Sequence, residues 1–273
     1  MTDTPGAPPP FSFHQGSAPL LISIPHGGVY LPPPLADRLA PEARAVPDTD
    51  WHLERLYAFA KDMGASLLAA THSRYVIDLN RPPDGASLYP GQNVTGLCPV
   101  DTFDETPLYV RGDLPDAAEI AARREAIWAP YHAQLRAELD RIRAAHGVAM
   151  LWDAHSIRSV LPRFFQGKLP DFNLGTADGA SCAPALAQEL LRIAQSAPGY
   201  TAVLNGRFKG GHITRHCGDP TRGIHAVQLE MTQCSYMQEA LPFAYLPERA
   251  AQVQPHVRRM LEAVLGFTGR AAR

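Results

Sequence analysis

Two histidines of the chain stand where apolar runs typical of buried β-strands come to an end. His26 follows the run Leu20–Ile24, and His155 lies in an Asp-Ala-His-Ser sequence directly after residues 148–152. Ligands bind at the carboxyl ends of the strands in open α/β sheets. We therefore expect both imidazoles to lie at one edge of the same sheet and to form the chemical centre of the protein.

Carboxylates are placed to complete such a centre. Asp48 and Asp50 stand at the start of an expected helix, where one aspartate suffices as N-cap and the other is available as a metal ligand. Glu230 lies inside the apolar run 224–231, where a charged side chain is costly unless it is paired or functional. Two histidines and one carboxylate form a common catalytic zinc set, and a nearby glutamate can accept a proton from water.

Basic residues in two places could bind an acidic substrate. Asn80 and Arg81 follow an expected strand at 75–79, and the planar guanidinium group suits a carboxylate. The glycine-broken stretch 205–216 lacks the spacing of a phosphate-binding loop. It holds three further candidates: Arg207, His212 and Arg215.

Two other classes of function compete with a metal-dependent hydrolase. A Ser-His-Asp hydrolase could use Ser23 or Ser156, but the chain has no Gly-x-Ser-x-Gly elbow. A binding protein for small dicarboxylates would not need a glutamate buried beside two histidines. Turnover separates the classes, because a binding protein retains the dicarboxylate and releases no product.

The composition favours one α/β domain. The chain has 273 residues, 45% of them hydrophobic, and a net charge of −2. It has no basic stripe to support a nucleic-acid role and no apolar run of membrane-spanning length. Its four cysteines form no CxxC pair, which indicates free thiols in a reducing cytoplasm. We expect residues 1–10 to be a flexible N-terminus and 11–273 to form the domain, and the oligomeric state stays open.

The pattern of apolar residues also predicts the elements around this centre. Strands are expected at 20–24, 66–70, 75–79, 148–152, 201–204 and 224–231. Helices are expected at 48–64, 116–146, 181–196 and 247–265, with caps at Asp116 and Ser181 and a kink at Pro130. Trp128 and Tyr131 are expected to pack in the core, and 84–114 and 158–176 to be irregular segments.

Six ordered motifs resemble those of the N-formylglutamate amidohydrolase family. They lie at 23–28, 48–51, 73–81, 151–156, 206–215 and 228–231, so that the resemblance runs from about residue 10 to 265. It implies a mixed, mostly parallel sheet flanked by helices, similar to that of the zinc carboxypeptidases. It also implies cytoplasmic hydrolysis of N-formyl-L-glutamate to L-glutamate and formate in histidine degradation. The alternative within enzymes is a related deacylase that acts on another N-acyl acidic amino acid.

The resemblance also assigns roles to single residues. It implies one divalent metal ion, Zn²⁺ by expectation, held by His26, His155 and a carboxylate for which we choose Asp50 over Asp48. Glu230 is then the general base. We expect Asp153 and Asp48 to contact the metal ligands and orient them without binding the metal themselves.

The substrate's two carboxylates need two cationic anchors. The resemblance assigns the first to Asn80 and Arg81. We expect Arg215 to be the second, with Arg207 and His212 as the other candidates. Cys217 departs from the family pattern, because an aromatic residue is expected there.

Overall fold

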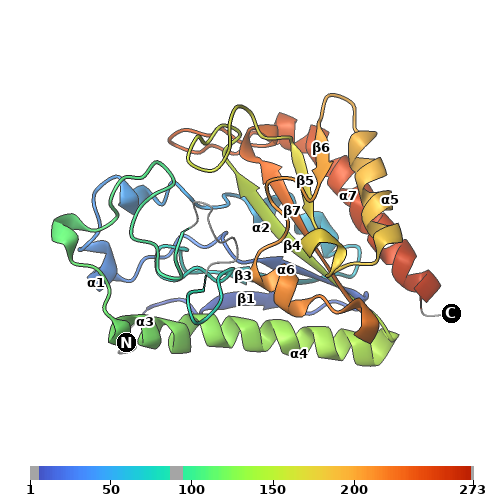
Figure 1. Ribbon diagram of the computed structural model, residues 1–273, viewed down its shortest axis with the longest axis horizontal. Coiled ribbons are helices and arrows are strands. Elements are labelled where there is room, and N and C mark those ends of the chain that lie inside the picture. The colour runs from blue at the N-terminus through green and yellow to red at the C-terminus, as the bar shows by residue number, and fades with distance from the viewer. Residues whose placement is uncertain (1–5, 87–94, 272–273) are drawn as a thin grey trace.

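A seven-stranded sheet runs through the middle of the molecule within the residues that the computed structural model describes, 6–86 and 95–271 (Figure 1). Its strand order is β1-β3-β2-β4-β7-β5-β6. Strands β3, β2, β4 and β7 are parallel to one another, whereas β1 pairs antiparallel with β3 and β5 pairs antiparallel with β7. The strands are β1 (Phe11–His14), β2 (Leu20–Ile24), β3 (Ser66–Ala70), β4 (Ala149–Ile157), β5 (Phe172–Gly175), β6 (Ala202–Leu204) and β7 (Ile224–Thr232).

Helices cover both faces of this sheet (Figure 1). Helices α4 (Ala129–His146) and α6 (His212–Cys217) pack on one face, and α2 (Leu53–Leu56), α5 (Pro184–Gln195) and α7 (Pro247–Ala271) pack on the other. Burial on both faces explains why the central strands read as continuous apolar runs. The mixed, mostly parallel sheet between helices that the sequence predicts is confirmed, and its likeness to zinc carboxypeptidases stays a prediction.

Shorter elements complete the described part of the chain. They are α1 (Pro33–Ala36), α3 (Ala117–Arg123), a π-helical turn at Arg124–Trp128, and 3₁₀ turns at Ala43–Ala45, Ala58–Ala60, Val110–Gly112, Ala177–Gly179, Pro220–Arg222 and Gln233–Ser235. No helix within the described ranges is long and apolar enough to cross a membrane.

The alternation of side chains along two central strands decides which of them reach the site. In β4, Leu151 packs in the apolar cluster beneath α4 and α6, so Asp153 and His155 point to the same face. The parallel register places His155 beside Glu230 of β7. Polar groups from two neighbouring strands therefore meet on the α4 side of the sheet.

The expected strand at 75–79 is wrong. This segment is a buried turn, and the amide of Asp78 donates to the carbonyl of Leu97 at 2.7 Å rather than to a neighbouring strand. Its apolar side chains are buried in the cluster that also contains residues of α4 and α6. A continuous run of buried apolar residues thus reads like a strand even where the backbone makes no sheet ladder.

The expected helix at 48–64 is also wrong in most of its length. The helical segment is the short α2, followed by a 3₁₀ turn, because His52 takes a left-handed conformation with φ 62° in front of it. Asp48 and Asp50 therefore lie outside a helix start. Ser181 does not cap α5 either, since its hydroxyl donates to the carbonyl of Ala226.

The long helix is confirmed at both ends. The Asp116 side chain accepts the Glu119 amide at 2.8 Å, and Gly147 closes α4 in a left-handed conformation. The interruption expected at Pro130 occurs just before it, as the π-helical turn, while α3 and α4 continue along one rod (Figure 1).

Strands β1 and β5 are additions to the predicted set, and β4 continues to Ile157, beyond the predicted end. His155 thus lies within a strand rather than after it. The expected flexible N-terminus at 1–10 and the irregular segment at 84–114 fall partly outside the described residues.

Candidate metal centre and active site

His26, Asp50 and His155 come together in a buried group whose ligand atoms all lie within 4.8 Å of one another. Asp50 Oδ2 lies 3.7 Å from His26 Nδ1 and 3.1 Å from His155 Nδ1. Ligand atoms bound tetrahedrally to Zn²⁺ are about 3.4 Å apart. The donor set, two imidazoles and one carboxylate, therefore fits a single divalent ion such as Zn²⁺.

The outer nitrogens of both histidines face a second carboxylate. His26 Nε2 is 2.7 Å from Asp78 Oδ1, and His155 Nε2 is 3.3 Å from Asp153 Oδ1. Such carboxylates fix the orientation and tautomer of imidazoles that bind metal. Asp153 thus lies where the sequence places it. Asp78 is an addition that sequence reasoning missed, although it stands in a motif that carries the resemblance.

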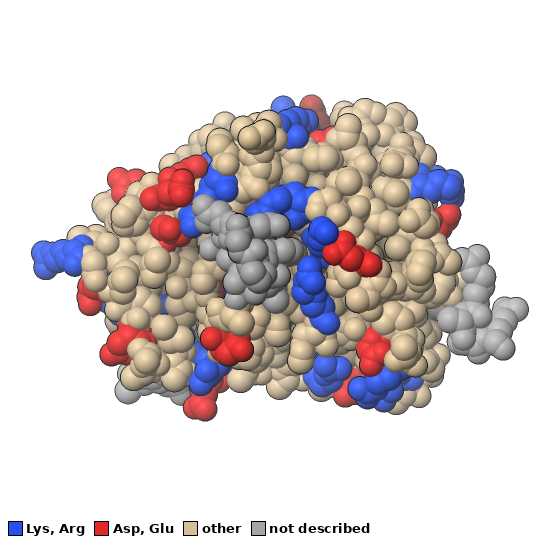
Figure 2. Space-filling model, viewed as in Figure 1, with Lys and Arg blue, Asp and Glu red and all other residues tan. Residues whose placement is uncertain are grey.

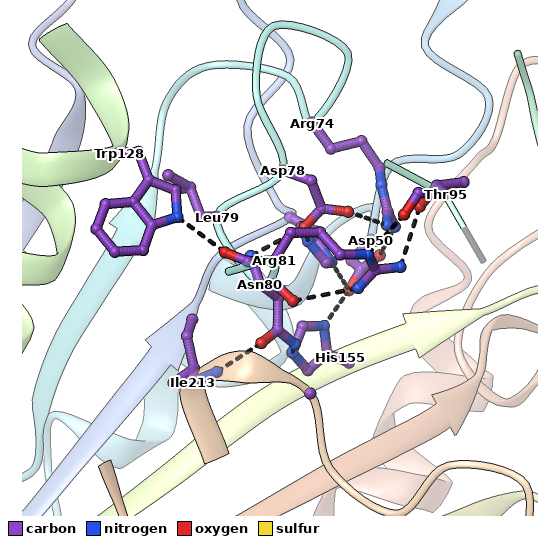
Figure 3. A network of polar contacts seen from close by, with 12 residues as sticks. Asp50, Arg74, Asp78, Leu79, Asn80, Arg81, Thr95, Trp128, His155 and Ile213 are labelled. Carbon is purple, nitrogen blue, oxygen red and sulfur yellow. Dashed lines mark hydrogen bonds and ion pairs between the residues drawn. The ribbon is translucent and has the colours of Figure 1, made fainter. Parts of the chain in front are cut away.

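Buried negative charge exceeds buried positive charge at this group. The carboxylates of Asp50, Asp78 and Asp153 are all buried, and the guanidinium buried beside them in the described structure is that of Arg74. Arg74 Nη2 is 2.7 Å from Asp78 Oδ2, and its Nη1 is 3.9 Å from Asp50 Oδ1 (Figure 3). A buried surplus of anions is unfavourable without a cation, so the charges support the same conclusion as the donor set.

The same charges act on the ionisation of their neighbours. Burial alone would raise the pKa of Asp78, but His26 and Arg74 hold it well below its ordinary value. Burial alone would lower the pKa of His155, but Asp153 and Asp50 raise it well above its ordinary value. A divalent ion bound to the imidazole would replace the proton that these carboxylates attract.

Glu230 lines the pocket next to this group and is 7% exposed. Burial raises the pKa of Glu230 to about 8, although the neighbouring His155 lowers it. A cation bound nearby would favour the charged carboxylate. Glu230 therefore has the position and the basicity of a group that can accept a proton from water.

Gln228 holds the Glu230 side chain. Gln228 Oε1 accepts the amide of Gly211 at 2.7 Å, which turns Nε2 towards Glu230 Oε2 at 3.3 Å. Both side chains lie on the same face of β7, two residues apart. Gln228 is a second addition to the residues expected from the sequence.

Asp48 lies outside the group of three potential ligands. Its Oδ2 accepts the hydroxyl of Tyr75 at 2.6 Å and the amide of Phe103 at 2.8 Å. Burial raises the pKa of Asp48 despite these bonds. Asp48 thus joins the turn at 75–79 to the loop that contains Phe103, and Asp50 is the carboxylate that reaches both histidines.

Asn80 and Arg81 both line the pocket (Figure 3). Asn80 Nδ2 lies 3.0 Å from His155 Nε2, while its Oδ1 accepts the amide of Ile213 at 2.8 Å. Arg81 donates through Nε to the carbonyl of Thr95 at 2.8 Å. The structure thus brings the expected carboxylate-binding pair to the edge of the metal-ligand group.

The three candidate residues of the glycine-broken stretch have different surroundings. Arg207 lines the pocket and donates to the carbonyl of Phe164 at 2.6 Å. Arg215 donates to the carbonyl of Gly210, and His212 packs against His132. Among the described residues, the pocket lining includes neither Arg215 nor His212. Figure 2 shows several Lys and Arg side chains close together near the middle of the face in view.

The pocket wall combines these polar groups with apolar ones. Cys217 packs in the apolar cluster beneath α4 and lies outside the described pocket lining. The aromatic and aliphatic side chains in the lining are Phe103, Ile157, Phe164 and Phe208. Small-molecule sites commonly consist of an apolar wall with a few polar groups that fix orientation.

Comparison with known proteins identifies the family. The model of the N-formylglutamate amidohydrolases matches residues 18–237. The chain belongs to the N-formylglutamate amidohydrolase family. N-formylglutamate deformylase of Pseudomonas putida is 55% identical over 256 residues, which are 94% of this chain and 96% of that protein. That of Pseudomonas aeruginosa is 54% identical, with 94% and 96% covered.

Solved structures agree with this membership of the N-formylglutamate amidohydrolase family. The crystal structure of N-formylglutamate amidohydrolase from Ralstonia eutropha JMP134 superposes with a TM-score of 0.82 at 26% identity, covering 96% of this chain and 99% of that one. A protein from Agrobacterium tumefaciens shares the fold, with a TM-score of 0.72 at 18% identity over 97% and 98% of the two chains. The family that the six sequence motifs indicate is confirmed.

Proposed function

We propose that this chain hydrolyses N-formyl-L-glutamate to L-glutamate and formate, with one divalent metal ion as cofactor and Zn²⁺ as the ion we expect. The observation that carries the proposal is the buried group of His26, Asp50 and His155 beside Glu230, in a pocket that is also lined by Arg81 and Arg207. The identity of 55% to a protein named N-formylglutamate deformylase supports the choice of substrate.

In this proposal, His26, Asp50 and His155 hold the ion. When bound, the ion supplies Lewis acidity, which lowers the pKa of water and polarises a carbonyl oxygen. Glu230 accepts a proton from the attacking water and passes it to the nitrogen that leaves as the amide C–N bond breaks. Gln228 bonds to Glu230 Oε2, which leaves Oε1 to take up that proton.

The substrate's two carboxylates are assigned to Arg81 and Arg207, because the third arginine of the described pocket lining, Arg74, is paired with Asp78. Arg81, with Asn80, lies beside His155, and we assign it the carboxylate close to the reacting amide. Arg207 lies in the same lining and replaces Arg215 as the anchor that we propose for the second carboxylate. A guanidinium group binds a carboxylate through two parallel hydrogen bonds.

A formate-release assay combined with metal analysis tests the proposal. The purified protein should contain about one divalent ion per chain and release formate from N-formyl-L-glutamate. Glu230→Gln should keep the ion and lose roughly 10²- to 10⁴-fold in kcat, because the amide cannot accept the water's proton.

Two results would redirect the assignment. A protein that binds L-glutamate and releases no formate would be a dicarboxylate-binding protein. Faster turnover of another N-acyl acidic amino acid would indicate a related deacylase. The role in histidine degradation and the cytoplasmic location belong to the same proposal and rest on the family resemblance.

A further inference from the structure

One face of the long helical rod is bonded to the chain segment 79–83, which carries Asn80 and Arg81. We call Arg124, Trp128 and His132 the donor face. Each of its side chains donates to a main-chain carbonyl of the segment, since a carbonyl oxygen can only accept. The three bonds run from Arg124 Nη1 to Pro83 O (3.2 Å), from Trp128 Nε1 to Arg81 O (3.0 Å) and from His132 Nε2 to Leu79 O (2.8 Å).

The spacing of these bonds is regular on both sides. The donors are four residues apart, which is about 6 Å along a helix. The acceptors are two residues apart, which is at most about 7 Å of chain. Because the helix and the segment run in opposite directions, three successive donors stay in step with three alternate carbonyls. A single such bond needs no explanation, whereas three in register indicate a fitted contact.

The π-helical turn contributes to this fit. It spans Arg124–Trp128, so that it begins and ends on two members of the donor face. Trp128 also stacks on His132 with ring centroids 3.7 Å apart. Turns of this kind are uncommon and occur frequently at functional sites. Trp128 is half-buried and packs against the apolar cluster, as the sequence predicts, and its indole N–H also donates to the segment.

The opposite side of the segment faces the pocket. Asn80 lies against His155, and Arg81 lines the pocket, while Trp128 approaches the segment from the side away from His155 (Figure 3). A shift of the main chain at Arg81 would therefore move both substrate-binding side chains relative to the metal ligands.

We infer that Arg124, Trp128 and His132 are positioning residues that set the place of Asn80 and Arg81. The inference rests on the proposed function, because it requires that these two side chains bind a substrate carboxylate. None of the three donors takes part in the bond-breaking step assigned to Glu230. Their loss should therefore weaken substrate binding and leave the chemical step nearly unchanged.

Trp128→Phe in the metal-loaded enzyme tests this inference. Phenylalanine keeps an aromatic ring beside His132 but cannot donate to Arg81. We expect KM for N-formyl-L-glutamate and the dissociation constant of L-glutamate, measured by calorimetry, to rise about 2- to 10-fold, with kcat within about twofold of wild type. His132→Phe should have a similar effect, and the double variant a larger one.

Trp152→Phe is the matched control. Trp152 also donates one indole hydrogen bond, to the hydroxyl of Tyr57 at 2.9 Å, but it lies in the apolar core. This variant should lower the unfolding temperature and leave KM unchanged. A purely structural role of Trp128 would make the two variants behave alike.

Arg81→Ala separates failure of this inference from failure of the proposed function. If Arg81→Ala raises KM and Trp128→Phe does not, the donor face does not position the pair and the inference is overturned, while the proposed function stands. If the metal-loaded wild-type chain releases no formate, the proposed function fails, and the inference fails with it.

Discussion

At the scale of single residues, two aspartates of one short motif have different surroundings. Asp50 reaches both histidines, whereas Asp48 bonds to Tyr75 and Phe103. Asp50→Asn should therefore lose bound metal, because a neutral amide is a weaker ligand than a carboxylate. Asp48→Asn should keep the metal and lose stability. Metal content and unfolding temperature, measured on both variants, check this, and equal metal loss in the two would contradict it.

A second pair of residues tests the substrate's second anchor. Arg207 lines the pocket and Arg215 does not. Arg207→Ala should reduce the preference for N-formylglutamate over N-formylglutamine, because the glutamine compound lacks the side-chain charge that Arg207 would bind. Removing one charged hydrogen bond costs about 1.5–3 kcal/mol, which is roughly 10- to 100-fold in kcat/KM. Arg215→Ala is the control. A shift of preference in this control alone would return the role to Arg215.

At the scale of elements, the sequence predicts best those strands that are buried on both faces. Leu20–Ile24 and Ile224–Thr232 consist mostly of apolar residues. His26 follows the first strand and Glu230 lies within the second, so both strands and these site residues are predictable. The segment 75–79 has the same apolar character without a sheet ladder. Strand Phe172–Gly175 has only four residues and its partners are distant in sequence, so the sequence does not predict it.

The residues of the site also divide into those that the sequence predicts and those that it does not. The metal-ligand group follows from residue types at strand ends, because those types carry the chemistry themselves. The places of Asp78, Gln228 and Trp128 follow from hydrogen bonds across more than 15 residues of chain. Spacing along the sequence contains no signal for such contacts.

The start of α6 offers a test at this scale. A Cβ atom at Gly211 would lie 2.3 Å from Asn80 Nδ2, so the helix can approach the pocket only without a side chain there. Gly211→Ala should displace Asn80 and reduce kcat/KM by at least about tenfold, the equivalent of 1.4 kcal/mol. Gly266→Ala, in α7, is the control, because a Cβ there meets no atom within 4 Å and alanine favours a helix. Equal activity of both variants would contradict the role of Gly211.

At the scale of the whole molecule, His132 of α4 and His212 of α6, whose ring centroids lie 5.5 Å apart, make the fold sensitive to acid. Burial lowers the pKa of His132 to about 3 and that of His212 to about 4. Between these values and the ordinary pKa near 6.5, the unfolded chain binds more protons than the folded one. Stability should therefore fall as the pH drops from about 6.5 to about 4.

Thermal unfolding across this range, followed with and without His132, separates this effect from the carboxylates. His132→Phe should be less stable than wild type near pH 8, since it lacks the bond to Leu79. The variant should lose less stability on acidification, because it has one fewer buried imidazole to protonate. Parallel curves for the two proteins would show that His132 does not contribute.

Strand β1 has a consequence for any shortened form of the chain. It follows a proline-rich start, yet Phe11–His14 pairs with four of the five residues of β3 and forms one border of the sheet. Trimming the chain up to residue 14 would uncover the amides and carbonyls of residues 67–70, four residues without a charge. Open borders of this kind recruit strands from other molecules. Strand β1 thus protects this border of the sheet against self-association, and it does so independently of the chemistry in the pocket.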